Sequence, residues 1–234
     1  MAAKKRRAYF TPFELILWFS SVLLIVLSFA FLDGENYLYL SASLIGVTSL
    51  IFCAKGNPAG QVLMIIFSII YGIISYGFGY YGEMITYLGM TMPMAVFSLI
   101  SWLKNPYNGS RSQVRINKTG IKENLLLLLP LSIVVTIVFY FILRHFNTPN
   151  LIPCTLSVLT SFTAAYLTLR RSPYYAAAYA LNDLVLIYLW WLAGLDDTRY
   201  ISVTVCFTAF FANDIYGFIS WKKLEKTQNK EKNI

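Results

Sequence analysis

Charged side chains are scarce in this sequence. Among 234 residues only 13% are Asp, Glu, Lys or Arg, and 57% are hydrophobic, against roughly 25% and 45–50% in soluble domains. Histidine occurs once and cysteine three times. Cys53, Cys154 and Cys206 lie far apart in apolar segments, which excludes a disulfide framework and a clustered metal site. These shortages argue against a soluble fold and predict an all-α membrane protein.

The apolar residues form about eight blocks, each near the length of a helix that spans the hydrocarbon core. The blocks are apolar on all sides and lack the alternation of a barrel strand, so helices are the expected form. Residues that end helices stand at each junction. The first block lacks a signal-peptide cleavage site and is expected to remain as an extra helix. The expected spans are 13–32, 37–54, 59–78, 84–102, 124–143, 151–169, 174–193 and 200–221.

The basic residues fall almost entirely on one side of the predicted membrane. If the run Lys4-Lys5-Arg6-Arg7 is cytoplasmic, only Arg144 and Arg199 of the 19 Lys and Arg residues lie outside. The positive-inside rule therefore predicts a protein of the bacterial cytoplasmic membrane with both termini in the cytoplasm. Contact with anionic membrane lipid explains the basic loop at 103–123 and the basic tail at 222–234, so no nucleic-acid partner is expected.

Two sequence matches indicate an internal repeat. Lys55-Gly56-Asn57-Pro58 resembles Arg170-Arg171-Ser172-Pro173, an offset that also superposes Gly79 on Gly194, and the helix end at 97–102 resembles that at 216–221. The matches predict two parallel three-helix repeats, 37–102 and 151–221. An extra N-terminal segment, 1–36, precedes them, a loop and one linking helix, 103–150, join them, and the tail, 222–234, follows. Such repeats are a transporter architecture with a substrate site near the midplane.

Polar residues inside the spans mark the candidate site. Asp183 and Asp214 follow asparagines within two predicted helices, and an intramembrane carboxylate is a functional hypothesis because its burial costs about 2.5 kcal/mol or more. Helical spacing puts aromatic and polar side chains on one face with Asp183, which suits a ligand with a flat ring and hydroxyl groups. Alternatively, these polar groups only join helices, and Trp102 and Trp221 belong to interfacial belts. The candidate substrate-binding residues are Asn182, Asp183, Tyr175, Tyr179, Gln61, Ser68, Tyr71, Thr91, Trp190, Asn213 and Asp214.

Four segments carry a family resemblance: Lys55-Gly56-Asn57-Pro58, the turn Tyr80-Tyr81-Gly82-Glu83, the end of the fourth span from Ser98 to Trp102 with Lys104, and Ser172-Pro173-Tyr174-Tyr175. Over about residues 37–223 the chain resembles the PnuC family of bacterial vitamin transporters, best known for nicotinamide riboside. The resemblance implies a 3+1+3 core like that of SWEET sugar facilitators. It further implies facilitated diffusion with trapping by a soluble intracellular kinase, and a homotrimer.

The family's seventh-helix pattern, Trp-x-x-Trp-x-x-x-Asn or Asp, falls here on Tyr175, Ala178 and Asn182, with Asp183 adjacent. Only the first aromatic and the amide match, and Tyr179 stands beside the missing second tryptophan. The family's polar residue of the fourth helix falls near Thr91. The resemblance therefore implies a binding site on these helices but leaves the ring-stacking partner open.

Uptake of nicotinamide riboside is the leading functional hypothesis. A related transporter for thiamine, riboflavin or a deoxynucleoside is a second. An intramembrane enzyme is disfavoured, because the sequence has no HExxH or Gly-x-Ser-x-Gly motif and only His145 as an imidazole base. A receptor is disfavoured by the small loops. No cofactor, metal or catalytic residue is expected.

Transport is expected to run down the substrate gradient without ion coupling, because Asp183 has no second carboxylate on its own helix face. Its neighbours are amide and phenol groups, which can hydrogen-bond the carboxylate and keep it charged. A cation-coupled carrier is the alternative, in which Asp183 pairs across the interface with Asp214 or Glu83. In the leading hypothesis Asp214 lies nearer the inner gate.

Overall fold

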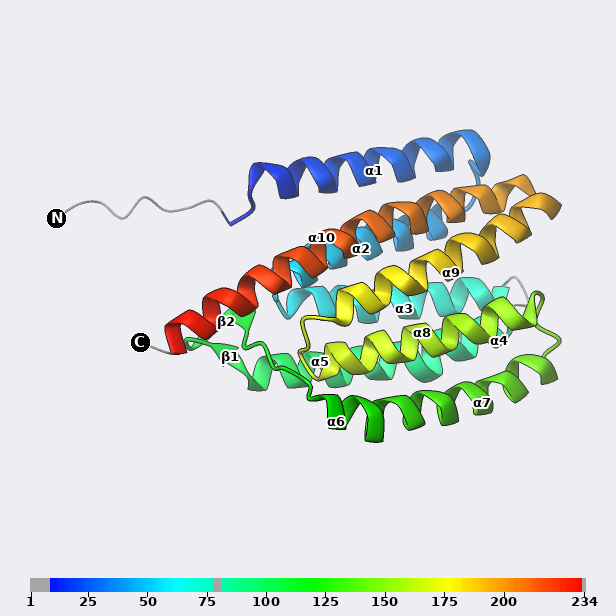
Figure 1. Ribbon diagram of the computed structural model, residues 1–234. Helices are drawn as coiled ribbons and strands as arrows, with labels where there is room; N and C mark the ends of the chain where they lie inside the picture. Colours follow the sequence, from blue (N-terminus) through cyan, green and yellow to red (C-terminus); the bar gives the residue numbers. More distant parts are fainter. Residues whose placement is uncertain (1–8, 78–80, 233–234) are drawn as a thin grey trace.

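The computed structural model describes residues 9–77 and 81–232, and helices make up nearly all of this part of the chain (Figure 1). The run Lys4-Lys5-Arg6-Arg7, together with Gly79 and Tyr80, lies outside the described residues. The elements in order are α1 (Pro12–Leu32), α2 (Tyr37–Ala54), α3 (Ala59–Gly77), α4 (Tyr81–Thr86), the π-helical turn η1 (Tyr87–Thr91), α5 (Met92–Lys104), β1 (Pro106–Tyr107), β2 (Ser110–Val114), α6 (Ile121–Glu123), the π-helical turn η2 (Asn124–Leu128), α7 (Leu129–His145), α8 (Leu151–Leu169), α9 (Tyr175–Asp196), the 3₁₀ turn η3 (Thr198–Tyr200) and α10 (Ile201–Lys232).

The prediction of eight membrane-spanning helices is confirmed within the described residues. Two predicted spans coincide with α2 and α8 in both bounds. The fourth span is interrupted: α4, η1 and α5 run on from Tyr81 to Lys104 with a π-helical turn immediately before Met92 and Pro93. Proline lacks a backbone N–H and clashes with the preceding turn, and the wider π-helical turn accommodates it.

The segments at 103–123 and 222–232 differ from the predicted loop and tail. The 103–123 loop contains the antiparallel hairpin β1–β2, so the chain is not entirely helical. The tail at 222–234 is not a loose end, because α10 continues as a helix to Lys232. Its Gln228 accepts a hydrogen bond from the Ile116 amide (2.9 Å) and donates one to the Val114 carbonyl (3.1 Å). These bonds satisfy loop backbone groups and tie the extended helix to the hairpin.

The bundle places α1 at one edge, against α2 and α10, and α7 at the other, against α8 (Figure 1). The start of α1, the end of α10 and the hairpin lie at the same end of the bundle. We call this the inner end, and the opposite one the outer end. The extra helix is held by Glu14, whose buried carboxylate pairs with Lys55 (3.1 Å) and accepts a hydrogen bond from the Tyr216 hydroxyl (2.7 Å).

The two halves of the bundle exchange hydrogen bonds at the inner end. The Trp102 indole donates to the Thr168 carbonyl (2.9 Å), and the Trp221 indole donates to the Cys53 carbonyl (2.8 Å). The preceding serines act in the same way: Ser101 donates to the Leu169 carbonyl and Ser220 to the Ala54 carbonyl, both at 2.8 Å. Each half thus donates to the last carbonyls of a helix in the other half. The Ala54 and Leu169 carbonyls accept their bonds from these serines, while the Cys53 and Thr168 carbonyls also accept the backbone N–H of Gly56 and Arg171. Two parallel repeats that face one another would make this exchange.

The turns after α2 and α8 also match. Gly56 and Arg171 both have positive φ, at 69° and 57°. In each turn the next residue, Asn57 or Ser172, donates its amide to a carbonyl five positions back, at 3.0 and 2.9 Å. A left-handed conformation suits glycine and is unusual for arginine, so the surrounding fold imposes the same turn on two different residues.

Trp102 and Trp221 do not belong to an interfacial belt. Their side chains are 1% and 0% exposed, and their rings pack against each other with centroids 5.3 Å apart. Tyr175 lies edge-on to the Trp221 ring at 4.7 Å. We call Tyr175, Trp102 and Trp221 the inner seal, because the three rings fill the interior between the halves at this end.

The reciprocal bonds predict equal losses from two distant substitutions. Trp102→Phe and Trp221→Phe each keep an aromatic ring but lose the hydrogen bond between the halves and part of the buried ring volume, which should cost roughly 1–3 kcal/mol. We expect both variants to unfold at a clearly lower temperature in detergent, by similar amounts. Trp191→Phe is the control, since Trp191 is 54% exposed on the outside of α9. Loss in only one of the two buried variants would contradict the reciprocal arrangement.

Candidate functional site

A cavity lies between the two halves, near the middle of the helices. Its polar side chains come mainly from α4, α8, α9 and α10, and aromatic rings from α3, η1 and α10 complete its walls. We call it the central cavity. Its lining residues are Leu50, Met64, Phe67, Glu83, Thr86, Tyr87, Thr91, Ser157, Ser161, Tyr179, Asn182, Asp183, Leu186, Phe207, Phe210 and Asp214.

Helix packing brings the walls close together. A Cβ at Gly72 of α3 would lie 2.6 Å from Leu88 of η1, and a Cβ at Gly60 would lie 2.7 Å from the Cys53 amide nitrogen of α2. Both distances are too short for a side chain. Small residues at such crossings let helices approach closely in a membrane, so glycine at these positions holds α3 against both of its neighbours beside the cavity.

Asn182 is fixed by a neighbouring helix. It is buried, and its Oδ1 accepts a hydrogen bond from the Thr160 hydroxyl of α8 (2.8 Å). The carbonyl side of the amide is thus engaged, which leaves the two N–H donors as what Asn182 offers a ligand. Ser157 and Ser161 line the same wall from α8.

Asp183 and Asp214 form a carboxyl pair. Both side chains are buried, one on α9 and one on α10, and they lie in hydrogen-bonding contact. A hydrogen bond between two carboxyl groups requires one proton, because carboxylate groups only accept. No other hydrogen bond to the Asp183 carboxyl group is found among the described residues, and its Oδ2 is fully buried. The Asn182 amide and the carboxyl pair are the groups on this wall that a ligand could contact.

The charges that line the central cavity are all acidic. Glu83, Asp183 and Asp214 contribute three carboxyl groups, and none of the described lining residues is Lys, Arg or His. The aromatic rings of Tyr87, Tyr179 and Phe210 lie in the same walls. A cavity of this kind attracts a cation and suits a flat ring, through the carboxylates and through the negative faces of the aromatic rings.

The structure brings together only part of the predicted site. Tyr179, Asn182, Asp183, Thr91 and Asp214 line the central cavity. Asp214, expected nearer the inner gate, contacts Asp183 directly.

Four predicted residues lie elsewhere. Gln61 hydrogen-bonds to the Cys53 sulfur (3.3 Å), and Ser68 donates to its own helix at Met64 (2.8 Å). Asn213 faces the extra helix and donates to Ser21 (2.9 Å). Tyr175 belongs to the inner seal.

The remaining two, Tyr71 and Trp190, line a second cavity toward the outer end. We call it the outer cavity. Its lining residues are Asp33, Asn36, Tyr39, Tyr71, Ile74, Ser75, Glu83, Trp190, Asp197, Arg199, Tyr200 and Val203.

Sequence reasoning missed Glu83 and Tyr87 as site residues. The sequence predicts Glu83 in a turn before a span that begins at residue 84, whereas α4 begins at Tyr81 and buries Glu83. Tyr87 lies in the π-helical turn, which changes the helix faces that regular spacing predicts. An acidic residue next to an apolar run was the available signal for Glu83, and Pro93 was the signal for the irregular turn.

Comparisons with known proteins agree with this fold. The chain matches the profile of the family described as "Nicotinamide mononucleotide transporter" over residues 36–223. The relatives include the nicotinamide riboside transporter PnuC of Neisseria mucosa, 24% identical over 198 residues, which cover 83% of this chain and 75% of the relative. They also include the nicotinamide riboside transporter PnuC of Haemophilus influenzae, 21% identical over 218 residues, which cover 93% of each chain.

The fold itself has a solved counterpart. A crystal structure of the vitamin B3 transporter PnuC superposes with a TM-score of 0.80 and covers 94% of each chain at 23% sequence identity. At this identity the likeness shows a shared fold. The arrangement of the helices therefore belongs to an architecture known from experiment.

The carboxyl pair predicts a difference between two substitutions of Asp183. Asp183→Asn supplies an N–H donor to Asp214 and should leave thermal stability nearly unchanged. Asp183→Leu removes the partner of a buried carboxyl group and should cost roughly 1–3 kcal/mol. Thermal unfolding of the purified variants in detergent measures both. If the asparagine variant were as unstable as the leucine variant, the pair would not be held by the inferred hydrogen bond.

Proposed function

The chain belongs to the nicotinamide mononucleotide transporter family, and from this premise we propose that it takes up nicotinamide riboside across the bacterial cytoplasmic membrane. The observation that carries the choice is the charge of the central cavity. Nicotinamide riboside is an N-glycosylated pyridinium and has a fixed positive charge. Three carboxyl groups and several aromatic rings in one cavity match a cationic ring.

The same observation disfavours the phosphorylated substrate. A phosphate group is held by arginine, lysine or helix N-termini, and none of the described lining residues of the central cavity is basic. A mononucleotide would bring its phosphate toward Glu83, Asp183 and Asp214. Riboflavin and deoxynucleosides lack the fixed positive charge, whereas thiamine carries one. Thiamine is therefore the alternative substrate that the cavity chemistry leaves in competition.

The binding groups are assigned by their chemistry. The pyridinium ring lies among Tyr87, Tyr179 and Phe210, where aromatic faces and carboxylates both favour a cation. The ribose hydroxyls are bound by the Asn182 amide and by the Asp183 carboxyl group. Ser157 and Ser161 add hydroxyl groups on the same wall.

The remaining features of the proposal rest on the sequence and on the family resemblance. Both termini lie in the cytoplasm, since the basic residues gather at the inner end. The protein acts as a carrier and not as an enzyme, a soluble intracellular kinase traps the substrate, and the chain forms a homotrimer. The repeats 37–102 and 151–221 are supported by the reciprocal bonds of Ser101-Trp102 and Ser220-Trp221.

Transport proceeds by facilitated diffusion in this proposal, and one observation favours a second mode. The contact between Asp183 and Asp214 is the pairing that a cation-coupled carrier would use. If the carboxyl pair released its shared proton when a cationic substrate entered, the positive charge of the substrate would replace that of the proton. Facilitated diffusion requires that the pair keep its proton throughout the cycle.

Binding measurements test the substrate and the site together. We expect calorimetry to detect nicotinamide riboside and no nicotinamide mononucleotide. Asn182→Ala should weaken the binding of nicotinamide riboside by roughly 1–3 kcal/mol, because the ligand loses a buried hydrogen-bond partner. Asn213→Ala is the matched control, an asparagine beside Asp214 that faces α1 instead of the cavity. Equal affinity for the mononucleotide, or equal loss in both variants, would contradict the assignment.

Proteoliposomes separate the two transport modes. With equal nicotinamide riboside inside and outside, facilitated diffusion predicts no net accumulation when a pH or sodium gradient is imposed. Accumulation driven by a pH gradient would instead establish proton coupling. Its abolition in Asp183→Asn, which holds Asp214 without a shared proton, would identify the carboxyl pair as the carrier.

A further inference from the structure

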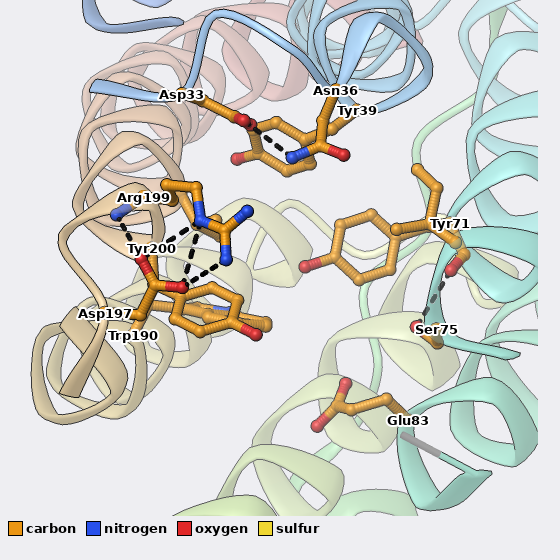
Figure 2. Close-up of a pocket in the computed structure, with 12 residues that line it drawn as sticks. Asp33, Asn36, Tyr39, Tyr71, Ser75, Glu83, Trp190, Asp197, Arg199 and Tyr200 are labelled. Atoms are coloured by element: carbon orange, nitrogen blue, oxygen red, sulfur yellow. Dashed lines mark hydrogen bonds and ion pairs between the residues drawn. The ribbon is translucent and has the colours of Figure 1, made fainter. Parts of the chain in front are cut away.

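The outer cavity has walls that suit a flat cation. Four aromatic residues surround it: Tyr39 on α2, Tyr71 on α3, Trp190 on α9 and Tyr200 on η3 (Figure 2). They stand in two pairs. The Trp190 and Tyr200 rings lie 5.6 Å apart with an interplanar angle of 38°, and the Tyr39 and Tyr71 rings lie 6.4 Å apart at 64°. A cage of aromatic faces binds quaternary and ring-borne cations through the ring quadrupoles.

Acidic groups complete the cage. Asp33, Glu83 and Asp197 line the outer cavity, and Arg199 is the one basic residue among its described lining residues. Arg199 is engaged by Asp197 through bonds of 3.0 and 2.7 Å to one carboxylate oxygen, and these bonds lower the pKa of Asp197. The opposite charges of Arg199 and Asp197 therefore cancel. Asp33 and Glu83 then give the cavity a negative field.

Polar groups also face the outer cavity. In Figure 2 the Tyr71 hydroxyl and the Glu83 carboxylate point toward the space between the aromatic residues. A phenol hydroxyl and a carboxylate offer hydrogen bonds to a polar substituent on a ring, such as a carboxamide.

A ring contact divides the outer cavity from the central one. Tyr71 lines the outer cavity and Tyr87 lines the central cavity, and their ring centroids lie only 4.4 Å apart. Phe67 packs against both rings, at 5.5 and 6.0 Å. Glu83 lines both cavities. The two cavities are therefore adjacent: they share the Glu83 carboxylate, and aromatic rings lie between them.

We propose that the outer cavity is a second binding site, which captures the cationic aromatic ring of the substrate before Tyr71 and Tyr87 part. The identity of the ring rests on the proposed function, and the chemistry of the site is that of an N-substituted pyridinium. The ribose is not needed for this capture, because the hydroxyl-binding residues Asn182 and Asp183 line only the central cavity.

N-methylnicotinamide that is methylated on the ring nitrogen is the probe, since it keeps the ring, the carboxamide and the positive charge but lacks the ribose. Calorimetry on the full-length protein in detergent should detect its binding and should not detect neutral nicotinamide. Tyr200→Leu should weaken the binding about fivefold or more through loss of a cation–aromatic contact, and Tyr200→Phe should restore it. Asp33→Asn should also weaken it, and this variant keeps the size of a half-buried side chain.

Two further variants locate the probe. Trp190→Leu should weaken its binding, whereas Trp191→Leu should not, because Trp190 is 8% exposed and lines the cavity while its neighbour is 54% exposed on the outside. Asn182→Ala should weaken nicotinamide riboside and leave N-methylnicotinamide unchanged. No binding of the probe, or binding that responds to Asn182→Ala and not to Tyr200→Leu or Asp33→Asn, would overturn the inference. Failure of the proposed function would appear separately, as absent binding of nicotinamide riboside.

Discussion

The exchange of hydrogen bonds at the inner end is the interaction on which the rest of the structure depends. Helix ends near the edge of a membrane present carbonyl groups that neither the helix nor, once buried, water can satisfy. Here the carbonyls that end α2 are satisfied by Ser220 and Trp221, and those that end α8 by Ser101 and Trp102. The two halves are locked at this end with their polar groups paired, and the rings that donate also close the interior.

This exchange of hydrogen bonds at the inner end determines where polar side chains can face a ligand. At the inner seal itself the interior between the halves is filled by indole and phenol rings. On the side of the inner seal that faces the outer end, the halves enclose the central cavity. There Asn182 is oriented by Thr160 and Asp183 by Asp214. The same dipeptide, Asn-Asp, serves two purposes on the two helices: Asn182 lines the cavity, while Asn213 fastens α10 to the extra helix α1. Side-chain identity alone does not decide between them.

The sequence predicts the spans well because hydropathy and helix-breaking residues act locally. It predicts Asn182 and Asp183 as site residues because carboxylates and amides are costly in a membrane and demand a reason. The sequence does not distinguish the roles of Tyr175 and Tyr179, since both lie on one helix face. They are one helical turn apart, and this turn places Tyr175 in the inner seal and Tyr179 in the central cavity. Trp102 and Trp221 were misassigned because a tryptophan near a helix end looks the same whether its partner is lipid or another helix. The pairing of Asp183 with Asp214 is a contact across helices that no periodicity within one helix contains.

The closures on the two sides of the central cavity differ in kind, and the difference bears on how the protein opens. The inner closure combines packed rings with four side-chain hydrogen bonds to helix ends, and the hairpin and the extended α10 brace it through Gln228. The outer closure near Tyr71 and Tyr87 consists of ring contacts, and it stands where α4 passes into a π-helical turn. Parting two rings exposes apolar surface but breaks no hydrogen bond between the rings, whereas opening the inner end would break four hydrogen bonds to helix-terminal carbonyls. Opening toward the outer end therefore costs less, and the bonds that must break for opening at the inner end have to be replaced by contacts with the substrate or by water.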